Sequence, residues 1–239
     1  MRTLAIIPAR YNSSRFPGKP LIDINGKSMI RRVYEQVMLT SVSKIIVATD
    51  DFRIADEVQE FGGEYVMTSS NHLCGTDRCI EVLSELSQYT HVINIQGDEP
   101  FINPQQIKQI DYHFQMNPDS SIITLAKKIE DKSLYQNPNC VKVQFNKENI
   151  ATSFERIVED TKQDVFKHIG IYGFKSEILL ELGNLAISEN EKKLKLEQLR
   201  WTDNGYDITV LPTQYESISI DTPEAVSYTH LTLPTILLV

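Results

Sequence analysis

Short apolar runs alternate with segments of helical periodicity in the first half of the chain. The runs, which are rich in β-branched residues, cover residues 4–8, 44–49, 64–68 and 91–96. The apolar faces between them consist of Met29, Ile30, Val33, Tyr34, Val37 and Met38, then Ile54, Ala55, Val58 and Phe61, then Ile80, Leu83 and Leu86. This alternation predicts repeated strand–helix–strand units and a parallel sheet covered by helices on both faces. Gly62 and Gly63 are expected to end the second helix.

The second half is less regular but predicts elements of the same α/β fold. Residues 141–145, 168–174 and 208–212 resemble strands, and a charged helix is expected over residues 189–201. No linker rich in proline, glycine or serine divides the chain, so we expect these strands to extend the first sheet. Residues 1–225 are accordingly expected to form a single domain.

The final segment, residues 226–239, follows neither a helical nor a strand pattern. It comes after Asp221-Thr222-Pro223-Glu224-Ala225, which resembles the start of a helix. Because the segment resembles the in-frame translation of a sequencing-library adaptor, we expect a non-native tail and leave it out of functional reasoning. An exposed native tail is the alternative.

Composition narrows the choice of partners. The chain has 239 residues and a formal net charge of −8, so it has no long-range attraction for nucleic acid or an anionic membrane. The cysteines, Cys74, Cys79 and Cys140, lack CxxC spacing, and we expect reduced structural thiols. The apolar start is too short for a signal peptide and no run reaches transmembrane length, which favours a cytoplasmic protein.

A basic loop follows the first predicted strand. The sequence PARYNSSRFPGKPL, residues 8–21, is neither a Walker loop nor a GxGxxG motif, but it places Arg10, Arg15 and Lys19 at a strand end. Guanidinium and ammonium groups bind several phosphate oxygens at once, so the loop suits a polyphosphate. A solvated basic loop is the alternative on composition alone.

Two aspartates follow other apolar runs. Asp98 lies in the motif QGDEP, residues 96–100, where Gly97 allows close backbone approach and the carboxylate can reach the ligand crevice of a parallel sheet. Asp221 comes after residues 217–220. Both are candidate magnesium ligands, although Asp98 could equally form a turn and Asp221 could cap a helix before Pro223.

Several motifs occur in a fixed order along residues 1–225. They are PARYNSSRFPGKPL, Asn25-Gly26-Lys27, Ala48-Thr49-Asp50, Gly75-Thr76-Asp77-Arg78, QGDEP, His168-Ile169-Gly170-Ile171-Tyr172, Leu196-Glu197-Gln198-Leu199-Arg200 and Asp221-Thr222-Pro223-Glu224. Together they resemble the 3-deoxy-D-manno-octulosonate (KDO) cytidylyltransferases, or CMP-KDO synthetases.

The resemblance implies a Rossmann-like, mononucleotide-binding nucleotidyltransferase fold with a mainly parallel central sheet, usually dimeric. It implies magnesium-dependent transfer of CMP from CTP to KDO for lipopolysaccharide synthesis, with pyrophosphate leaving. By the same resemblance, the CTP phosphates would be bound by Arg10, Arg15 and Lys19, with Arg78 in the nucleotide pocket. Magnesium would be bound by Asp98 and Asp221, and the catalytic residues would be Lys19, Asp98 and Asp221. The sugar would be bound by Gln96, Arg156, His168, Tyr172, Glu197 and Gln198.

Local alternatives remain for the sugar residues. His168 could be a hydrogen-bonded structural histidine, and Glu197 and Gln198 could lie on a solvated helix face. The chain also departs from the family between residues 152 and 167, where it is shortened, and Glu155 places an anion beside Arg156. Transfer of CMP to an amino-substituted KDO or a nonulosonic acid, or a catalytically silent CTP-binding protein, are therefore alternative functions.

Overall fold

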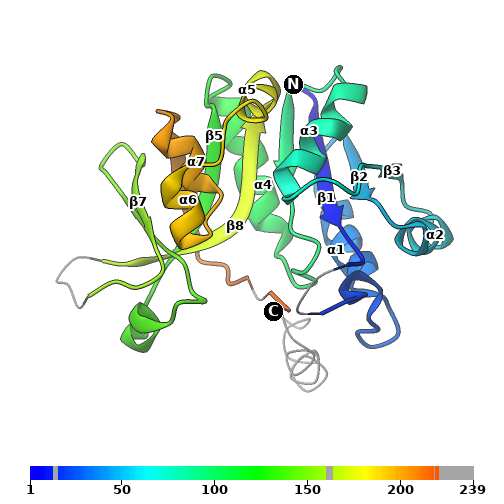
Figure 1. Ribbon diagram of the computed structural model, residues 1–239, viewed down its shortest axis with the longest axis horizontal. Helices are drawn as coiled ribbons and strands as arrows, with labels where there is room; N and C mark the ends of the chain where they lie inside the picture. The colour runs from blue at the N-terminus through cyan, green and yellow to red at the C-terminus, as the bar shows by residue number, and fades with distance from the viewer. Residues whose placement is uncertain (13–15, 160–163, 218, 221–239) are drawn as a thin grey trace.

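Four parallel strands form the first part of the central sheet (Figure 1). In the computed structural model, which describes residues 1–12, 16–159, 164–217 and 219–220, β1 (Thr3–Ala9) pairs with both β2 (Lys44–Thr49) and β4 (His91–Asn94). The short strand β3 (Tyr65–Met67) pairs with β2. These strands coincide with the four apolar runs, so the prediction of a parallel sheet is confirmed there.

The second half of the chain completes the same sheet. The strand order is β3-β2-β1-β4-β8-β5-β9, in which β8 (Phe166–Lys175) is antiparallel to β4 and β5 (Ile122–Lys128), and β9 (Ile208–Pro212) is parallel to β5. The sheet is therefore mainly parallel, as predicted. Two more strands, β6 (Lys142–Phe145) and β7 (Ala151–Glu155), form an antiparallel pair that joins the sheet through β8 and extends to one side in Figure 1.

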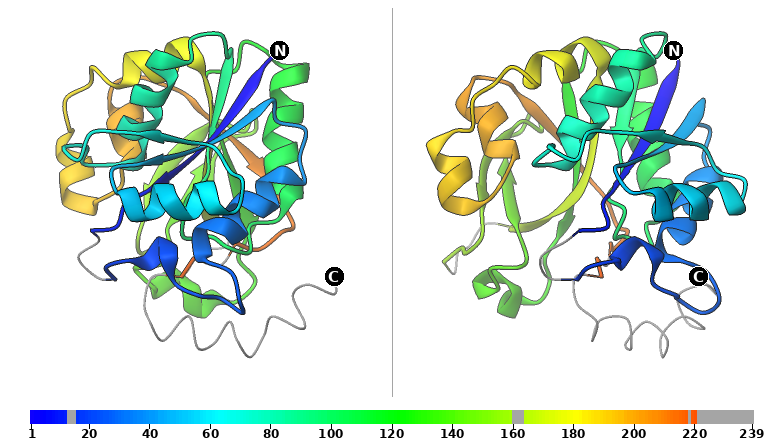
Figure 2. Two further views of the ribbon diagram at one scale, coloured as in Figure 1. Left: turned by 90° about the vertical axis from the view of Figure 1, so that its right-hand side faces the viewer. Right: turned by 45° about the vertical axis from the view of Figure 1, so that its right-hand side comes forward.

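Helices cover both faces of the sheet, as Figure 2 shows. One face carries α1 (Met29–Met38), α2 (Phe52–Glu60) and α4 (Pro104–Met116), and the other carries α3 (Gly75–Glu85) and α5 (Ser176–Leu182). Two single-turn helices, η1 (Lys19–Leu21) and η2 (Lys132–Gln136), lie in loops. No helix in these described ranges is long and apolar enough to cross a membrane.

Helix ends follow the local sequence. Ser28, Asp51 and Asn103 accept hydrogen bonds from the first backbone amides of α1, α2 and α4. Gly62, with φ of 79°, follows α2 in the left-handed conformation, so the predicted end of that helix is confirmed.

The charged helix predicted over residues 189–201 is wrong as a single element. The structure has two short helices instead, α6 (Glu189–Leu194) and α7 (Gln198–Asp203). Lys195 separates them in the left-handed conformation, with φ of 54°, which an α-helix does not contain. The break turns Leu196 into the core, where it is 5% exposed, so tertiary packing decides the path of the chain.

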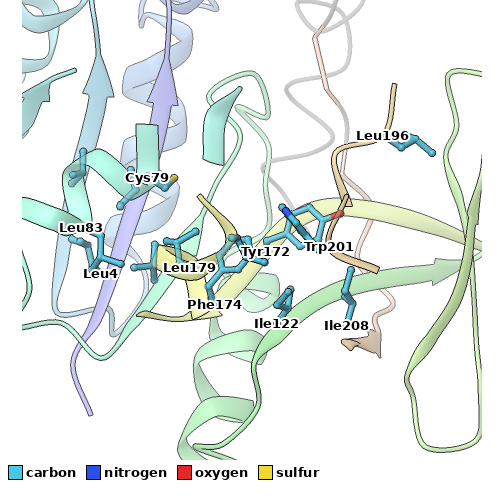
Figure 3. Close-up of a cluster of buried hydrophobic side chains, with 14 of the residues drawn as sticks. Leu4, Cys79, Leu83, Ile122, Tyr172, Phe174, Leu179, Leu196, Trp201 and Ile208 are labelled. Atoms are coloured by element: carbon cyan, nitrogen blue, oxygen red, sulfur yellow. The ribbon is translucent and has the colours of Figure 1, made fainter. Parts of the chain in front are cut away.

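An aromatic cluster binds α7 to the sheet (Figure 3). Trp201 of α7 packs edge-on against Tyr172 and Phe174 of β8, with ring centroids 5.0 and 5.3 Å apart. All three side chains are buried, and burial of aromatic surface is a large stabilising contribution. The start of α7, where Glu197 and Gln198 lie, is therefore fixed relative to the middle of the sheet.

We expect Gly173→Ala to destabilise the fold by about 1–3 kcal/mol, because the core has no room for an added methyl group there. A Cβ on Gly173 would lie 2.5 Å from Ile110 Cγ2 and 2.6 Å from Phe114 Cε2. Gly170→Ala is the matched control in the same strand, since the nearest atom to its added Cβ is 3.9 Å away. Urea denaturation of both variants measures the difference, and equal midpoints would contradict this account.

Candidate active site

A pocket opens at the carboxyl ends of β1 and β4, the edge at which parallel sheets usually bind ligands. Three segments line it: the basic loop after β1, the turn that leads into α3, and the QGDEP motif after β4. The sequence-predicted site residues that the structure brings together here are Arg10, Lys19, Arg78, Gln96 and Asp98. The pocket therefore unites the candidate phosphate and metal residues.

Lys19 and Asp98 form the central ion pair of this pocket. Lys19 Nζ lies 2.6 Å from Asp98 Oδ2, and the two side chains are only 15% and 27% exposed. Asp98 reaches this position because Gly97 packs against β1, where an added Cβ would lie 2.8 Å from the Pro8 carbonyl oxygen. A side chain at position 97 would move the carboxylate out of place.

Arg78 forms a fixed part of the pocket wall. Its buried guanidinium donates hydrogen bonds to Thr68 Oγ1 at 2.7 Å and to the Ser69 carbonyl oxygen at 3.2 Å. It also pairs with Asp50 Oδ2 at 2.8 Å. Arg78 thus joins the ends of β2 and β3 to α3, which agrees with a role in shaping the pocket.

Two pocket residues whose side chains can form hydrogen bonds, His72 and Cys74, were not identified as site residues from the sequence. His72 lines the wall and pairs through Nε2 with Glu81, and Cys74 donates a hydrogen bond from Sγ to Glu197 Oε1 at 2.9 Å. Burial raises the pKa of the Cys74 thiol, which keeps it protonated and able to donate. The sequence could have indicated both residues only through their position just before the Gly75-Thr76-Asp77-Arg78 motif.

Glu197 and Gln198 do not lie on a solvated helix face. Gln198 is 5% exposed, and Glu197 is partly buried between Cys74 and Thr76, which both hydrogen-bond to its carboxyl group. Burial raises the pKa of Glu197 above its ordinary value despite these hydrogen bonds. Glu197 is joined to the pocket wall through Cys74, but neither Glu197 nor Gln198 is among the described residues that line the pocket.

His168 lies in β8 beside a bulge at which the β5–β8 register shifts. Thr124 Oγ1 lies 2.9 Å from His168 Nε2 and is also within hydrogen-bond distance of the carbonyl oxygens of Ile169 and Ile171, at 3.1 and 2.9 Å. The contact with Thr124 holds the imidazole of His168 against β5. Burial lowers its pKa to about 3, so the ring is neutral near pH 7.

The other predicted sugar residues are spread over adjoining regions. Gln96 Nε2 donates to the Gly170 carbonyl oxygen at 3.3 Å, which links the pocket to β8. His168 and Gly170 line a neighbouring hollow together with Glu99 and Ser217. Tyr172 is buried in the core, 5.4 Å from the His168 ring centroid, and its hydroxyl has no hydrogen-bond partner within the described part of the chain.

Arg156 lies apart from the pocket. Its guanidinium donates to the carbonyl oxygens of Leu194 at 2.6 Å, Pro138 at 2.8 Å and Lys195 at 3.0 Å. These contacts hold the end of α6 against the segment after η2. In this arrangement the arginine is a structural anchor, and the structure does not bring it to the other sugar residues.

Arg15, Asp221 and the tail at residues 226–239 lie outside the described residues. Ile220, the residue before Asp221, is nevertheless held beside the pocket. The Ile220 amide donates to the Asp98 carbonyl oxygen at 2.9 Å, and the Ile220 side chain packs with Ile24 and Met29.

The donor chemistry of the pocket fits magnesium. Asp98 supplies hard carboxylate oxygens, and magnesium is commonly bound by one or two carboxylates with substrate phosphates and water completing its shell. The part of the chain that the structure describes contains no group of three or more His, Cys, Asp or Glu residues arranged to bind a metal by themselves. The residues therefore suit an ion that arrives with a polyphosphate.

A family model described as cytidylyltransferase matches residues 4–208. The chain belongs to the cytidylyltransferase family. Two relatives, each named 3-deoxy-manno-octulosonate cytidylyltransferase, are 46% identical to it. The one from Parabacteroides distasonis matches over 94% of this chain and 95% of its own, and the one from Cytophaga hutchinsonii over 92% and 93%.

Solved structures agree with the family assignment. A CMP:2-keto-3-deoxy-manno-octonic acid synthetase complexed with CTP has a TM-score of 0.93 and 35% identity, over 98% of this chain and 99% of its own. A 4-diphosphocytidyl-2C-methyl-D-erythritol synthase from Anaerococcus prevotii has a TM-score of 0.64 and 17% identity, over 98% of this chain and 96% of its own, and so shares the fold. The nucleotidyltransferase fold predicted for this cytidylyltransferase is therefore confirmed.

The pKa of His168 predicts a pH dependence of stability. The folded pKa is about 3 against an ordinary 6.5, so between these values the unfolded chain binds a proton that the folded chain does not. The contribution of neutral His168 to the free energy of unfolding is complete above pH 6.5 and is lost as the pH falls toward 3. We expect His168→Gln to lose less free energy of unfolding than wild type between pH 7.5 and 5, by about 2 kcal/mol. Urea titrations at both pH values measure this, and parallel losses would contradict it.

Proposed function

We propose that this cytidylyltransferase transfers CMP from CTP to KDO, giving CMP-KDO and pyrophosphate for lipopolysaccharide synthesis. The observation that carries the proposal is the Lys19–Asp98 pair at the meeting point of the basic loop and the QGDEP motif. It places a cation and a hard anion in one pocket, as a metal-bound triphosphate requires. The relatives' names and the CTP-bound neighbour support the choice of both substrates.

The chain's own residues would act mainly by positioning and electrostatics. Arg10 and Lys19 would bind the phosphate oxygens and stabilise the negative charge that develops as pyrophosphate leaves. Asp98 and Asp221 would hold magnesium, which when bound lowers the pKa of the attacking sugar hydroxyl and neutralises phosphate charge. A sugar hydroxyl then attacks the α-phosphorus in line with the leaving pyrophosphate, and no covalent enzyme intermediate is needed.

The sugar would occupy the side of the pocket that faces β8 and α7. Gln96 lines the pocket, the start of α7 is joined to it through the Cys74–Glu197 hydrogen bond, and the neutral ring of His168 can hydrogen-bond to a sugar hydroxyl. Arg156 would reach the sugar carboxylate only by leaving its three carbonyl partners. We also propose a homodimer, as is usual for the family.

Because of the arrangement around Arg156, the assay must also distinguish two alternative functions. An enzyme whose arginine stays on the carbonyl oxygens of Pro138, Leu194 and Lys195 would bind a different acid, such as an amino-substituted KDO or a nonulosonic acid. A chain that binds CTP but turns over no acidic sugar would be catalytically silent.

We expect pyrophosphate release from CTP and magnesium to depend on added KDO. The assay compares KDO, an amino-substituted KDO and a nonulosonic acid, with a sugar-free reaction as control. The highest kcat/KM with KDO supports the proposal, because only matched contacts in the transition state raise that ratio. Faster release with another acid would reassign the substrate. Measurable CTP binding without release with any of the acids would contradict transfer.

We expect Asp98→Asn to lower turnover by roughly two orders of magnitude, because a neutral amide is a weaker ligand than a carboxylate for the magnesium that would neutralise the phosphate charge. The substitution keeps the side-chain shape, so the melting temperature should change little. Asp203→Asn, at an exposed aspartate that pairs with Asn190, is the control. Wild-type turnover with unchanged magnesium dependence in Asp98→Asn would contradict the metal assignment.

A further inference from the structure

Arg53 stacks on the aromatic ring at the start of the phosphate loop. Its Cζ lies 3.3 Å from the centroid of Tyr11, a distance typical of a close cation–π contact. Tyr11 comes directly after Arg10 in the basic loop, which also contains Lys19. Neither Arg53 nor Tyr11 is among the described residues that line the pocket.

Tyr11 in turn supports the end of the loop. The Gly18 amide donates to the Tyr11 carbonyl oxygen at 2.9 Å. A Cβ on Gly18 would lie 3.2 Å from Tyr11 Cζ, so the tyrosine ring also packs against the Gly18 backbone. Gly18 has φ of 73° and leads directly into η1, where Lys19 pairs with Asp98. The ring and this backbone bond close the loop just before its catalytic lysine.

Arg53 is itself held in place. Its Nε donates to Asp51 Oδ1 at 2.9 Å and its terminal nitrogen to Asp51 Oδ2 at 2.6 Å, a two-point contact that fixes the guanidinium plane. Asp51 also caps α2, so the plane is anchored to a helix end. An arginine in the first turn of a helix opposes the helix dipole. The ion pair with Asp51 offsets this unfavourable interaction and leaves the face of the guanidinium on the Tyr11 ring.

We propose that Arg53 is a positioning residue for the CTP phosphate loop, acting through Tyr11 and Gly18. The Asp51–Arg53 pair holds the Tyr11 ring against Gly18, and this sets where Lys19 begins. The nucleotide then meets a Lys19 that is already in position, so less conformational entropy is lost on binding. This proposal rests on the proposed function only in taking CTP as the ligand.

We expect Arg53→Leu to raise the KM for CTP about fivefold, the upper end of the scale of an exposed cation–π contact. The value of kcat at saturating CTP should fall less than threefold, because the bound triphosphate then orders the loop itself. The Arg53 side chain is 57% exposed, so the melting temperature should change little. Tyr11→Phe, which keeps the ring, should bind CTP like wild type, whereas Tyr11→Leu should resemble Arg53→Leu.

The matched control is Arg31→Leu. Arg31 also lies over an aromatic ring, 5.8 Å from the Phe61 centroid, and also pairs with an acid, Glu35, but its aromatic partner follows α2 and is not part of the basic loop. We expect its KM for CTP to stay within twofold of wild type. The double variant Arg53→Leu/Tyr11→Leu should be no worse than either single one, because both remove the same contact.

Direct titration with CTP and magnesium, without sugar, separates this proposal from the proposed function. If wild type binds CTP but releases no pyrophosphate with KDO, the substrate proposal fails while the affinity ratios still test Arg53. Unchanged CTP affinity in Arg53→Leu, an equal loss in Arg31→Leu, or additive losses in the double variant would overturn the positioning role. A fall in kcat and melting temperature with unchanged affinity would likewise overturn it, since that pattern indicates a purely structural residue.

Discussion

The close approach of the β1 and β4 ends is the constraint on which the active site depends. Gly97 lies so near the Pro8 carbonyl oxygen that only a residue without a side chain fits. This contact brings Asp98 within ion-pair distance of Lys19, although the residues are far apart in sequence. The Ile220 amide bonds to the same turn, so the segment that ends before Asp221 is held there as well.

Two supports of different chemistry hold the walls of this pocket. On the nucleotide side, Arg78 uses its buried guanidinium to join β2, β3 and α3 through Asp50, Thr68 and Ser69. On the other side, packing of Trp201 against β8 fixes α7, and the Cys74–Glu197 hydrogen bond joins α7 to α3. The hydrophobic core and the polar site are therefore mechanically connected, and a change in core packing can reach the pocket wall.

The pocket carries positively charged side chains although the chain as a whole has a net negative charge. A protein of net charge −8 repels a triphosphate at long range, so Arg10 and Lys19 must supply attraction at short range. Before a nucleotide binds, Asp98 neutralises Lys19, which lowers the cost of placing the ammonium in a partly buried pocket. In the proposed function, a metal-bound triphosphate would exchange this internal pair for contacts of both residues with the ligand.

Local periodicity by itself determined the first sheet strands, α1 to α3 and the position of the phosphate loop, because those elements are neighbours in sequence and each buries one continuous apolar face. The ordered motifs also indicated the family and most residues of the nucleotide pocket. Only the tertiary structure decided that residues 189–201 break at Lys195, that Cys74 and Thr76 orient Glu197, and that Arg156 bonds to three carbonyl oxygens. These features depend on groups brought together from distant parts of the chain, where packing outweighs helix propensity and no local pattern records the partner.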